Sequence, residues 1–200
     1  MNNTYKHKIH EIDSYLKKNL SNERYEHSLR VAQYAKYLAK VYDKTKKTAA
    51  LAYLAGLSHD ITKELPDEKQ ILIMKKMGRQ LSKVEKQRIN LLHGSTAAFV
   101  LRKKFHIHKK EILDALTFHT FGSPKLRTIG KLVFVADKIE PGREESEQLR
   151  ALVGQISFNK LTLKVLQFGI ERTEKKALLV SPLSRKMEKT LQRKVKLRVK

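Results

Sequence analysis

The amino-acid sequence predicts an all-α fold. Over most of its 200 residues, apolar side chains recur every three or four positions, which is the period of an amphipathic helix and not of a strand. Glycine and proline occur only 8 and 4 times, so few positions interrupt a helix. β-branched residues form only short runs. These observations favour a bundle of helices around one apolar core.

The N-terminal part of the chain contains the first three predicted helices. Residues 1–22 are expected to form one helix. Residues 24–42 repeat apolar side chains at helical spacing, and residues 48–60 form a strongly apolar helix with Thr48 as its expected cap.

The remaining helices are shorter or more polar, with one exception. Residues 68–77 and 83–92 are shorter and more polar, whereas residues 126–139 are strongly apolar. The other helices are predicted over residues 93–104, 109–118, 146–153 and 161–179. We expect three parts in sequence: the N-terminal helix at 1–22, a main domain at 23–180, and a basic C-terminal tail or helix at 181–200.

Composition restricts the class of protein. The chain has no cysteine, which excludes disulfides and thiolate metal sites. No apolar run approaches the roughly 18 residues that span a membrane, and the N-terminus lacks the apolar region of a signal peptide. We therefore expect a cytoplasmic protein without a membrane segment. The net charge of +23 favours anionic partners such as nucleotides or nucleic acids.

Six polar side chains stand on the apolar faces of the predicted helices. Helical periodicity points each of them inward. Burying an imidazole or a carboxylate there without a partner costs roughly several kcal/mol. Divalent cations relieve this penalty because their charge neutralises the ligands. Mixed imidazole and carboxylate ligands suit iron, manganese, zinc or cobalt. The six residues are His27, His59, Asp60, His93, His119 and Asp137.

Three of the four prolines follow these polar residues closely. Pro66, Pro124 and Pro141 come four to six positions after a member of the set. Because proline cannot continue a helix, the three residues that these prolines follow, Asp60, His119 and Asp137, are expected near helix C-termini. There a site can open to a ligand and still be held by a rigid scaffold.

The order H…HD…H…H…D resembles that of the HD-domain metal-dependent phosphohydrolases. The stretches RYEHSLRVAQYAKYLA, LAGLSHDITKEL, LLHGSTAAFVL, EILDALTFHTFG and KLVFVADKIEPGRE resemble the YqeK family, whose members are similar to bacterial symmetrical bis(5′-nucleosyl)-tetraphosphatases. The resemblance covers about residues 24–150. The stretch SHDIT departs from the family at Ser58, Ile61 and Thr62, whereas every metal-ligand position matches.

The resemblance implies a role for each matching residue. The core metal ligands would be His27, His59, Asp60 and Asp137, while His93 and His119 complete a second metal site or hold substrate phosphates. Asp60 and Lys63 would be catalytic, with Lys63 placed to meet phosphate oxygens. The residues implied in substrate binding are Arg24, Lys63, His93, His119, Thr120, Gly122 and Arg143.

The resemblance also implies the reaction. It is hydrolysis of diadenosine tetraphosphate and related dinucleoside polyphosphates, cleaved symmetrically to two ADP, with a mono- or dinuclear iron centre or with manganese or cobalt. A homodimer is implied as well. Residues 181–200 hold eight Lys or Arg against one Glu, so weak nucleic-acid association is expected there. Since no candidate ligand lies beyond Asp137, deleting residues 181–200 is expected to change turnover only a few-fold.

Two alternatives stay open at this point. One is another HD-type nucleotide phosphohydrolase, such as a nucleotidase or an alarmone hydrolase, although the EPGRE stretch after Asp137 favours the YqeK interpretation. The other is an RNA- or ribosome-associated binding protein with a vestigial metal site, which the basic C-terminal part supports. An intact set of six ligands favours the enzyme.

Overall fold

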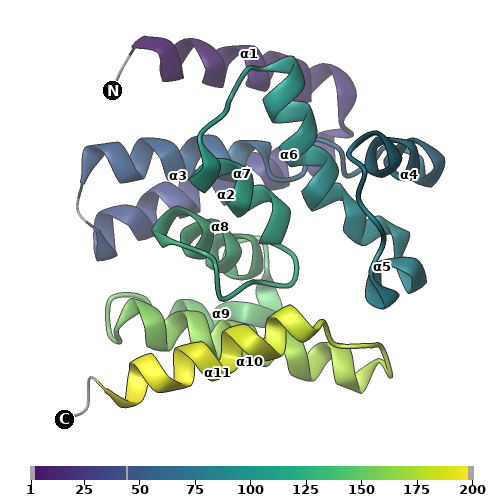
Figure 1. Cartoon of the computed structure of the whole chain (residues 1–200). Coiled ribbons are helices and arrows are strands. Elements are labelled where there is room, and N and C mark those ends of the chain that lie inside the picture. The colour runs from purple at the N-terminus through teal and green to yellow at the C-terminus, as the bar shows by residue number, and fades with distance from the viewer. Residues whose placement is uncertain (1–2, 44, 198–200) are drawn as a thin grey trace.

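The computed structural model describes residues 3–43 and 45–197, and every regular element within them is helical, as predicted (Figure 1). The outermost parts of the two predicted terminal segments, residues 1–2 and 198–200, lie outside the described residues. The first half of the chain forms α1 (Asn3–Asn19), α2 (Asn22–Tyr42), α3 (Lys46–Ser58), α4 (Asp67–Lys76), α5 (Lys83–Gln87), the 3-10 helix η1 (Ile89–Leu92) and α6 (His93–Lys104). The second half forms α7 (Lys110–Phe118), α8 (Thr128–Ile139), the 3-10 helix η2 (Glu144–Ser146), α9 (Glu147–Arg150), α10 (Phe158–Lys175) and α11 (Pro182–Lys196).

Local hydrogen bonds explain where the helices begin. The Ser21 side chain accepts a bond from the backbone N–H of Arg24 and caps α2. The sequence pointed to Thr48 as the cap of the next helix, which is one turn too late. Thr45 is the cap of α3, because its hydroxyl accepts a 3.1 Å bond from the N–H of Thr48.

Two predicted helices are broken in the structure. Residues 83–92 divide into α5 and η1, because Arg88 between them has an extended backbone at φ −138° and ψ 82°. Residues 146–153 hold only the single turn of α9, which passes into turns that end at Gly154 with φ +80°. The following helix, α10, starts earlier than expected because Ser157 caps it.

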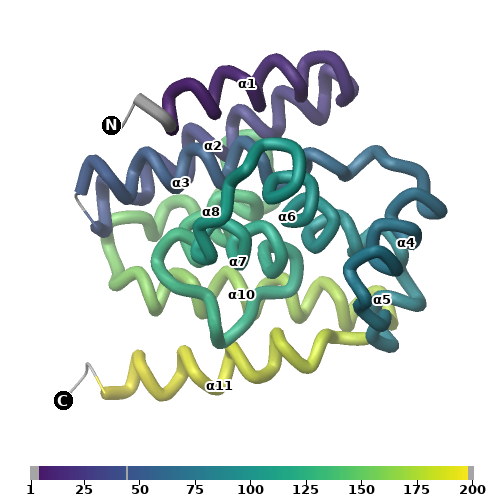
Figure 2. The backbone as a smooth tube through the Cα atoms, turned by 45° about the horizontal axis from the view of Figure 1, so that its top comes forward, coloured from purple at the N-terminus to yellow at the C-terminus, as the bar shows by residue number. Residues whose placement is uncertain are grey.

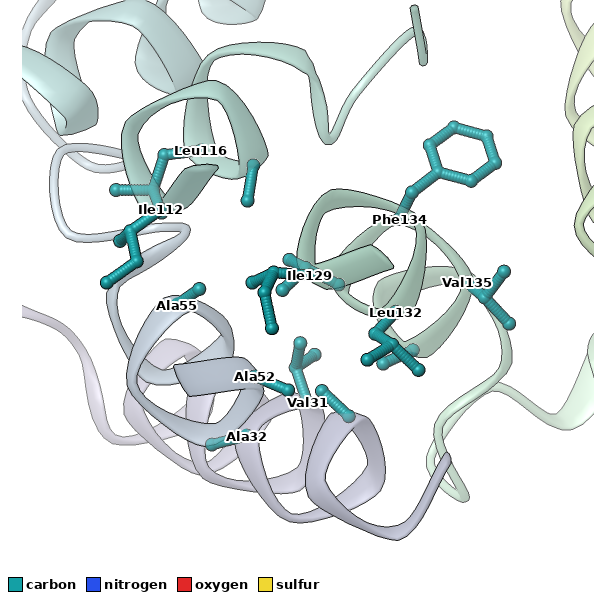
Figure 3. Packing of buried hydrophobic residues seen from close by; sticks show 14 of the residues in the cluster. Val31, Ala32, Ala52, Ala55, Ile112, Leu116, Ile129, Leu132, Phe134 and Val135 are labelled. Carbon is teal, nitrogen blue, oxygen red and sulfur yellow. The ribbon is translucent and has the colours of Figure 1, made fainter. Parts of the chain in front are cut away.

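The central core is formed by α2, α3, α7 and α8. Figure 3 shows Val31 of α2, Ala52 of α3 and Ile129 of α8 turned toward one another, with Leu116 of α7 closing the group. Small residues on α2 and α3 bring these two helices close together. α1 lies across this group, where Ile12 is fully buried. The result is one continuous core beneath the end of the bundle that carries the polar cluster.

The last two long helices form a second layer. α10 and α11 lie side by side below α8 in both views (Figures 1 and 2). Met187 and Leu191 of α11 are buried, and the Ser184 hydroxyl donates a 2.7 Å bond to the carbonyl of Phe121. Of the two states that the sequence left open for this segment, the structure has the docked helix.

In the described part of the chain, no helix is both long enough and apolar enough to cross a bilayer. This agrees with the absence of long apolar runs in the sequence.

A close contact between α2 and α3 generates a stability prediction. A Cβ at Gly56 of α3 would lie 2.9 Å from Cα of Ala32 in α2, so Gly56→Ala must push the two backbones apart. We expect a loss of about 1–3 kcal/mol in the free energy of unfolding. Urea unfolding measures it.

Gly169→Ala on α10 is the matched control. A Cβ there meets nothing within 4 Å, so helix propensity alone should make this change neutral or stabilising, by at most about 1 kcal/mol. Equal unfolding midpoints for Gly56→Ala and wild type would contradict the packing argument.

Candidate metal centre

The fold brings the six polar side chains into one buried cluster, although they are spread over more than 100 positions of the sequence. They come from four helix ends and from the interior of α2: His27 lies within α2, His59 and Asp60 follow α3, His93 begins α6, His119 follows α7, and Asp137 lies in the last turn of α8. All except Asp137 are nearly inaccessible to solvent, and the Asp137 side chain is 14% exposed.

The ligand atoms of five of these residues form two overlapping groups, and His93 belongs to neither. One consists of His27, His59 and Asp137, and the other of His59, Asp60 and His119. Within each group the nitrogen and oxygen atoms all lie within 4.8 Å of one another. His59 belongs to both groups. Two neighbouring ions, or one ion with a position beside it, can therefore be held by the same set of side chains.

The two oxygens of Asp60 face different partners. Its Oδ1 lies 3.2 Å from Nε2 of His93 and 3.7 Å from Nε2 of His119. Its Oδ2 lies 3.5 Å from Nε2 of His59 and 3.0 Å from the Arg24 guanidinium. Asp60 thus stands between the two halves of the cluster.

The histidines are oriented by a repeated local device. In three of them the Nδ1–H donates to the backbone carbonyl three residues earlier, at a helix end or turn. The pairs are His59 with Gly56 at 2.6 Å, His119 with Leu116 at 2.7 Å, and His93 with Asn90. Each bond fixes the tautomer, and the Nε2 lone pair therefore points into the cluster.

Glu140 orients the fourth histidine. This carboxylate is 1% exposed, and its Oε1 accepts a 3.1 Å bond from Nδ1 of His27. It also accepts bonds from Nε of Arg30 at 2.9 Å and from the N–H of Gly142 at 2.6 Å. Burial tends to raise the pKa of Glu140, but these donors lower it to about 2.

Glu140 was missed by the sequence reasoning. It lies inside the quoted EPGRE stretch, so its position beside a candidate ligand was the available signal.

The electrostatics of the cluster favour metal ligation. Burial lowers the pKa of His93 to about 3 and also lowers the pKa of His119, so both rings are neutral at pH 7. Burial would raise the pKa of Asp60, but the His59 ring and the other imidazoles hold that pKa well below its usual value. The pKa of Asp137 is likewise well below its usual value, because Lys138, His27 and His59 overcome the effect of burial.

These residues fit a divalent metal ion. Nε2 of His59 is buried without a hydrogen-bond partner. Nε2 of His93 lies only 3.0 Å from Nε2 of His119, although each ring already uses its Nδ1–H as a donor to a carbonyl. Two facing lone pairs repel each other, and a cation between or beside them removes that repulsion.

Besides Arg24, three cationic side chains lie beside the cluster. Lys63 Nζ lies 3.3 Å from Nδ1 of His93, and the Arg143 guanidinium lies 3.5 Å from Asp137. Lys138, which sequence reasoning missed, donates a 3.2 Å bond to Asp137 and a 2.7 Å bond to the carbonyl of His119. Burial lowers the pKa of Lys63 and of Lys138 below the usual value, although the neighbouring carboxylates oppose this shift.

The other two predicted substrate residues are placed differently from each other. Thr120 lines a cleft beside the cluster, and its Oγ1 is buried without a hydrogen-bond partner. Gly122 has φ +75°, and a Cβ there would lie 2.5 Å from Sδ of Met187 and 3.2 Å from the Phe134 ring. Packing of α11 therefore accounts for Gly122 without any contact to substrate.

Comparison with known proteins places this fold and site in a class. A family model described as the HD domain matches residues 24–142, which is more than half of the chain and contains all six clustered residues. The chain therefore belongs to the HD domain family.

Its relatives narrow the class. A symmetrical bis(5′-nucleosyl)-tetraphosphatase of Staphylococcus aureus is 38% identical over 130 residues, which is 64% of this chain and 63% of that protein. A protein of the same name from Halalkalibacterium halodurans is 33% identical over 64% of this chain and 67% of its own length. The chain thus spans just under two thirds of the length of the S. aureus relative.

A solved structure supports the same relationship. A crystal structure described as a predicted HD superfamily hydrolase involved in NAD metabolism, from Clostridium acetobutylicum, superposes with a TM-score of 0.83 at 32% identity. The match covers 92% of this chain and 96% of that one. This chain is related to the symmetrical bis(5′-nucleosyl)-tetraphosphatases of the YqeK type, as the sequence motifs indicated.

The Glu140 network generates a prediction for metal binding. Glu140→Gln keeps the size of the side chain but removes the charge that orients His27. Loss of such outer contacts usually weakens metal affinity about 10–100-fold, and we expect an effect in that range. Calorimetric titration of metal-free protein with Mn²⁺ measures it. Glu144→Gln, an exposed carboxylate on the same connection, is the control. Unchanged affinity in Glu140→Gln would show that His27 needs no such support.

Proposed function

We propose that this protein hydrolyses diadenosine tetraphosphate and related dinucleoside polyphosphates, with one water added and two ADP released. The observation that carries the proposal is the buried cluster of four imidazoles and two carboxylates beside an open, cationic cleft. The names of the S. aureus and H. halodurans relatives support the substrate and the symmetry of cleavage.

The proposed metal ligands are the six clustered residues. His27, His59, Asp60 and Asp137 would hold the principal ion, and His93 with His119 would complete a second position or contact phosphate. The shared position of His59 and the divided oxygens of Asp60 support a dinuclear centre. Iron is the proposed metal, and manganese or cobalt suits the same ligands.

A bound divalent cation supplies a water nucleophile at neutral pH and positive charge beside the phosphoryl oxygens. The protein's own residues do the rest. Asp60 and Asp137 fix the centre, and the surrounding burial keeps its charges strong. The leaving nucleoside diphosphate is a stable anion, so the reaction requires no strong general acid.

Cationic side chains would stabilise the polyphosphate. Lys63 and Arg143 stand on two sides of the cluster, within reach of oxygens on a phosphoryl group held there. Arg24 is held by Asp60 at 3.0 Å, and its Nε is buried without a partner among the described residues, so this N–H can donate to a substrate oxygen. We assign to Lys63 and Arg143 the stabilisation of the negative charge that develops on the phosphoryl group during the reaction. We assign to Arg24 the binding of the substrate.

Weak nucleic-acid association through α11 is a separate proposal. The buried face of α11 leaves its basic side chains on the outside, where they can contact phosphates and lose affinity as salt rises. The exposed residues are Lys186, Lys189, Arg193, Lys194 and Lys196.

Removing Asp60 tests the metal mechanism. Asp60→Ala deletes the carboxylate between the two histidine groups, so metal retention and hydrolysis should be lost together. Loss of an outer contact alone usually lowers metal affinity or activity about 10–100-fold, so loss of a direct ligand should lower turnover by more than about 100-fold. Metal content by elemental analysis and ADP release measure the two effects. Near-wild-type turnover in a metal-depleted variant would refute the mechanism.

Removing Lys63 tests the charge assignment. Lys63→Ala should keep the metal and lose about 10²–10³ in kcat, because a preorganised charge beside the reacting phosphoryl group is removed. Lys69→Ala, an exposed lysine on α4, serves as the control. If kcat is unchanged while the metal content is normal, Lys63 has no catalytic role.

A further inference from the structure

A cleft of about 320 Å³ adjoins the metal centre. Its inner end is formed by Thr120 and by Asp137 and Lys138 of α8, and its opposite wall is formed by α10 and the start of α11, including Gly169 and Arg172. The volume is at the low end of the roughly 300–1,000 Å³ that ligand pockets occupy. It suits one nucleoside better than a whole dinucleoside polyphosphate.

The far wall of this cleft lies outside the segment that defines the family. The HD match ends at residue 142, whereas α10 begins at Phe158 and α11 at Pro182. The metal centre and this wall are therefore contributed by different parts of the chain, and the family match by itself says nothing about what the wall contacts.

Two buried polar atoms in the cleft walls lack partners. Oγ1 of Thr120 and Nε of Arg88 have no hydrogen-bond partner among the described residues, and both residues line the cleft. A buried polar group left unpaired costs about 1–3 kcal/mol. A ligand with hydroxyls or ring nitrogens would offer these two atoms partners, whereas an apolar ligand would leave both unpaired.

Aromatic rings supply the other half of the expected chemistry. Phe121, Phe134 and Phe168 line the cleft, and the Arg172 guanidinium lies 5.6 Å from the centre of the Phe168 ring. Flat aromatic and guanidinium surfaces are what nucleobases stack on. Unpaired polar atoms and aromatic rings in the same cleft match a ribose joined to a base.

Gly169 is the most informative residue of the wall. It lies inside α10, where glycine is disfavoured by about 1 kcal/mol relative to alanine. Its φ is not positive, and a Cβ there would meet no atom of the described residues within 4 Å apart from the backbone of its own helix. Neither conformation nor packing calls for glycine at this position. A side chain there would instead take up room in the cleft.

We propose that α10 and the cleft it borders bind one nucleoside of the dinucleoside polyphosphate, and that Gly169 leaves room for its base. This inference rests on the proposed function for its substrate class. It replaces the expectation that residues 181–200 are separable from hydrolysis, because Ser181 and Ser184 line the same cleft and α11 holds the carbonyl of Phe121.

Gly169→Leu tests the proposal in the metal-loaded full chain. The leucine should fill the space of the base and weaken ADP binding at least 10-fold by calorimetry, and it should raise the KM for diadenosine tetraphosphate. Tripolyphosphate, which has no nucleoside, should bind the variant as it binds wild type. Lys164→Leu places the same side chain on an exposed position of α10 outside the cleft and should change neither ligand. Gly169→Ala, with a smaller side chain, should give a smaller effect.

Each result decides the proposal. Normal ADP binding in a folded, metal-loaded Gly169→Leu protein would overturn it. Equal weakening of ADP and tripolyphosphate would also overturn it, since the cleft would then hold phosphates. If Gly169→Leu does not fold, the binding of ADP and of tripolyphosphate to Gly169→Ala is compared in the same way. The proposed function can fail separately. If ADP binding depends on Gly169 but wild-type protein releases no ADP from diadenosine tetraphosphate, the reaction is refuted and the nucleoside site is retained.

Discussion

The burial of four imidazoles and two carboxylates in an apolar bundle is the constraint on which the rest of this structure depends. Each group alone would destabilise the fold, and together they repel or attract one another at 3.0 to 3.7 Å. The chain keeps them there by satisfying one side of every ring with its own backbone or with Glu140. The other side then remains available for a cation, and the stability of the centre becomes coupled to metal binding.

Helix ends orient two of the histidine rings. The last carbonyls of a helix have no partner within it, and His59 and His119 follow α3 and α7 directly, where their Nδ1–H groups bond such carbonyls. The ligand thus caps its own helix, and the rigid helix aims the ligand. Since α2, α3, α7 and α8 pack together in the core (Figure 3), the ends of α3, α7 and α8 and His27 within α2 come to one place, where His93 at the start of α6 joins them. The same packing that buries the apolar faces assembles the metal centre.

The two layers of the molecule carry different parts of the chemistry. The HD segment supplies the centre and the cations closest to it, such as Lys63 and Lys138. The layer of α10 and α11, which lies below α8 (Figure 2), contributes none of the six clustered residues. It borders the cleft beside them. Under the proposed function, the fixed set of ligands would hold the reacting phosphoryl group, and the shape of the second layer would select what is attached to the phosphates.

The sequence by itself determined the helical class, most helix positions and the six polar residues, because these depend on period and residue type, which are local. It misplaced the cap of α3 and joined α5 to η1, since one hydroxyl or one extended residue such as Arg88 decides such boundaries. Only the tertiary structure showed that Glu140 supports His27 across 113 positions, that Gly122 serves the packing of α11, and that Gly169 faces a cleft. These are contacts between distant segments, and no local pattern encodes which distant surfaces will meet.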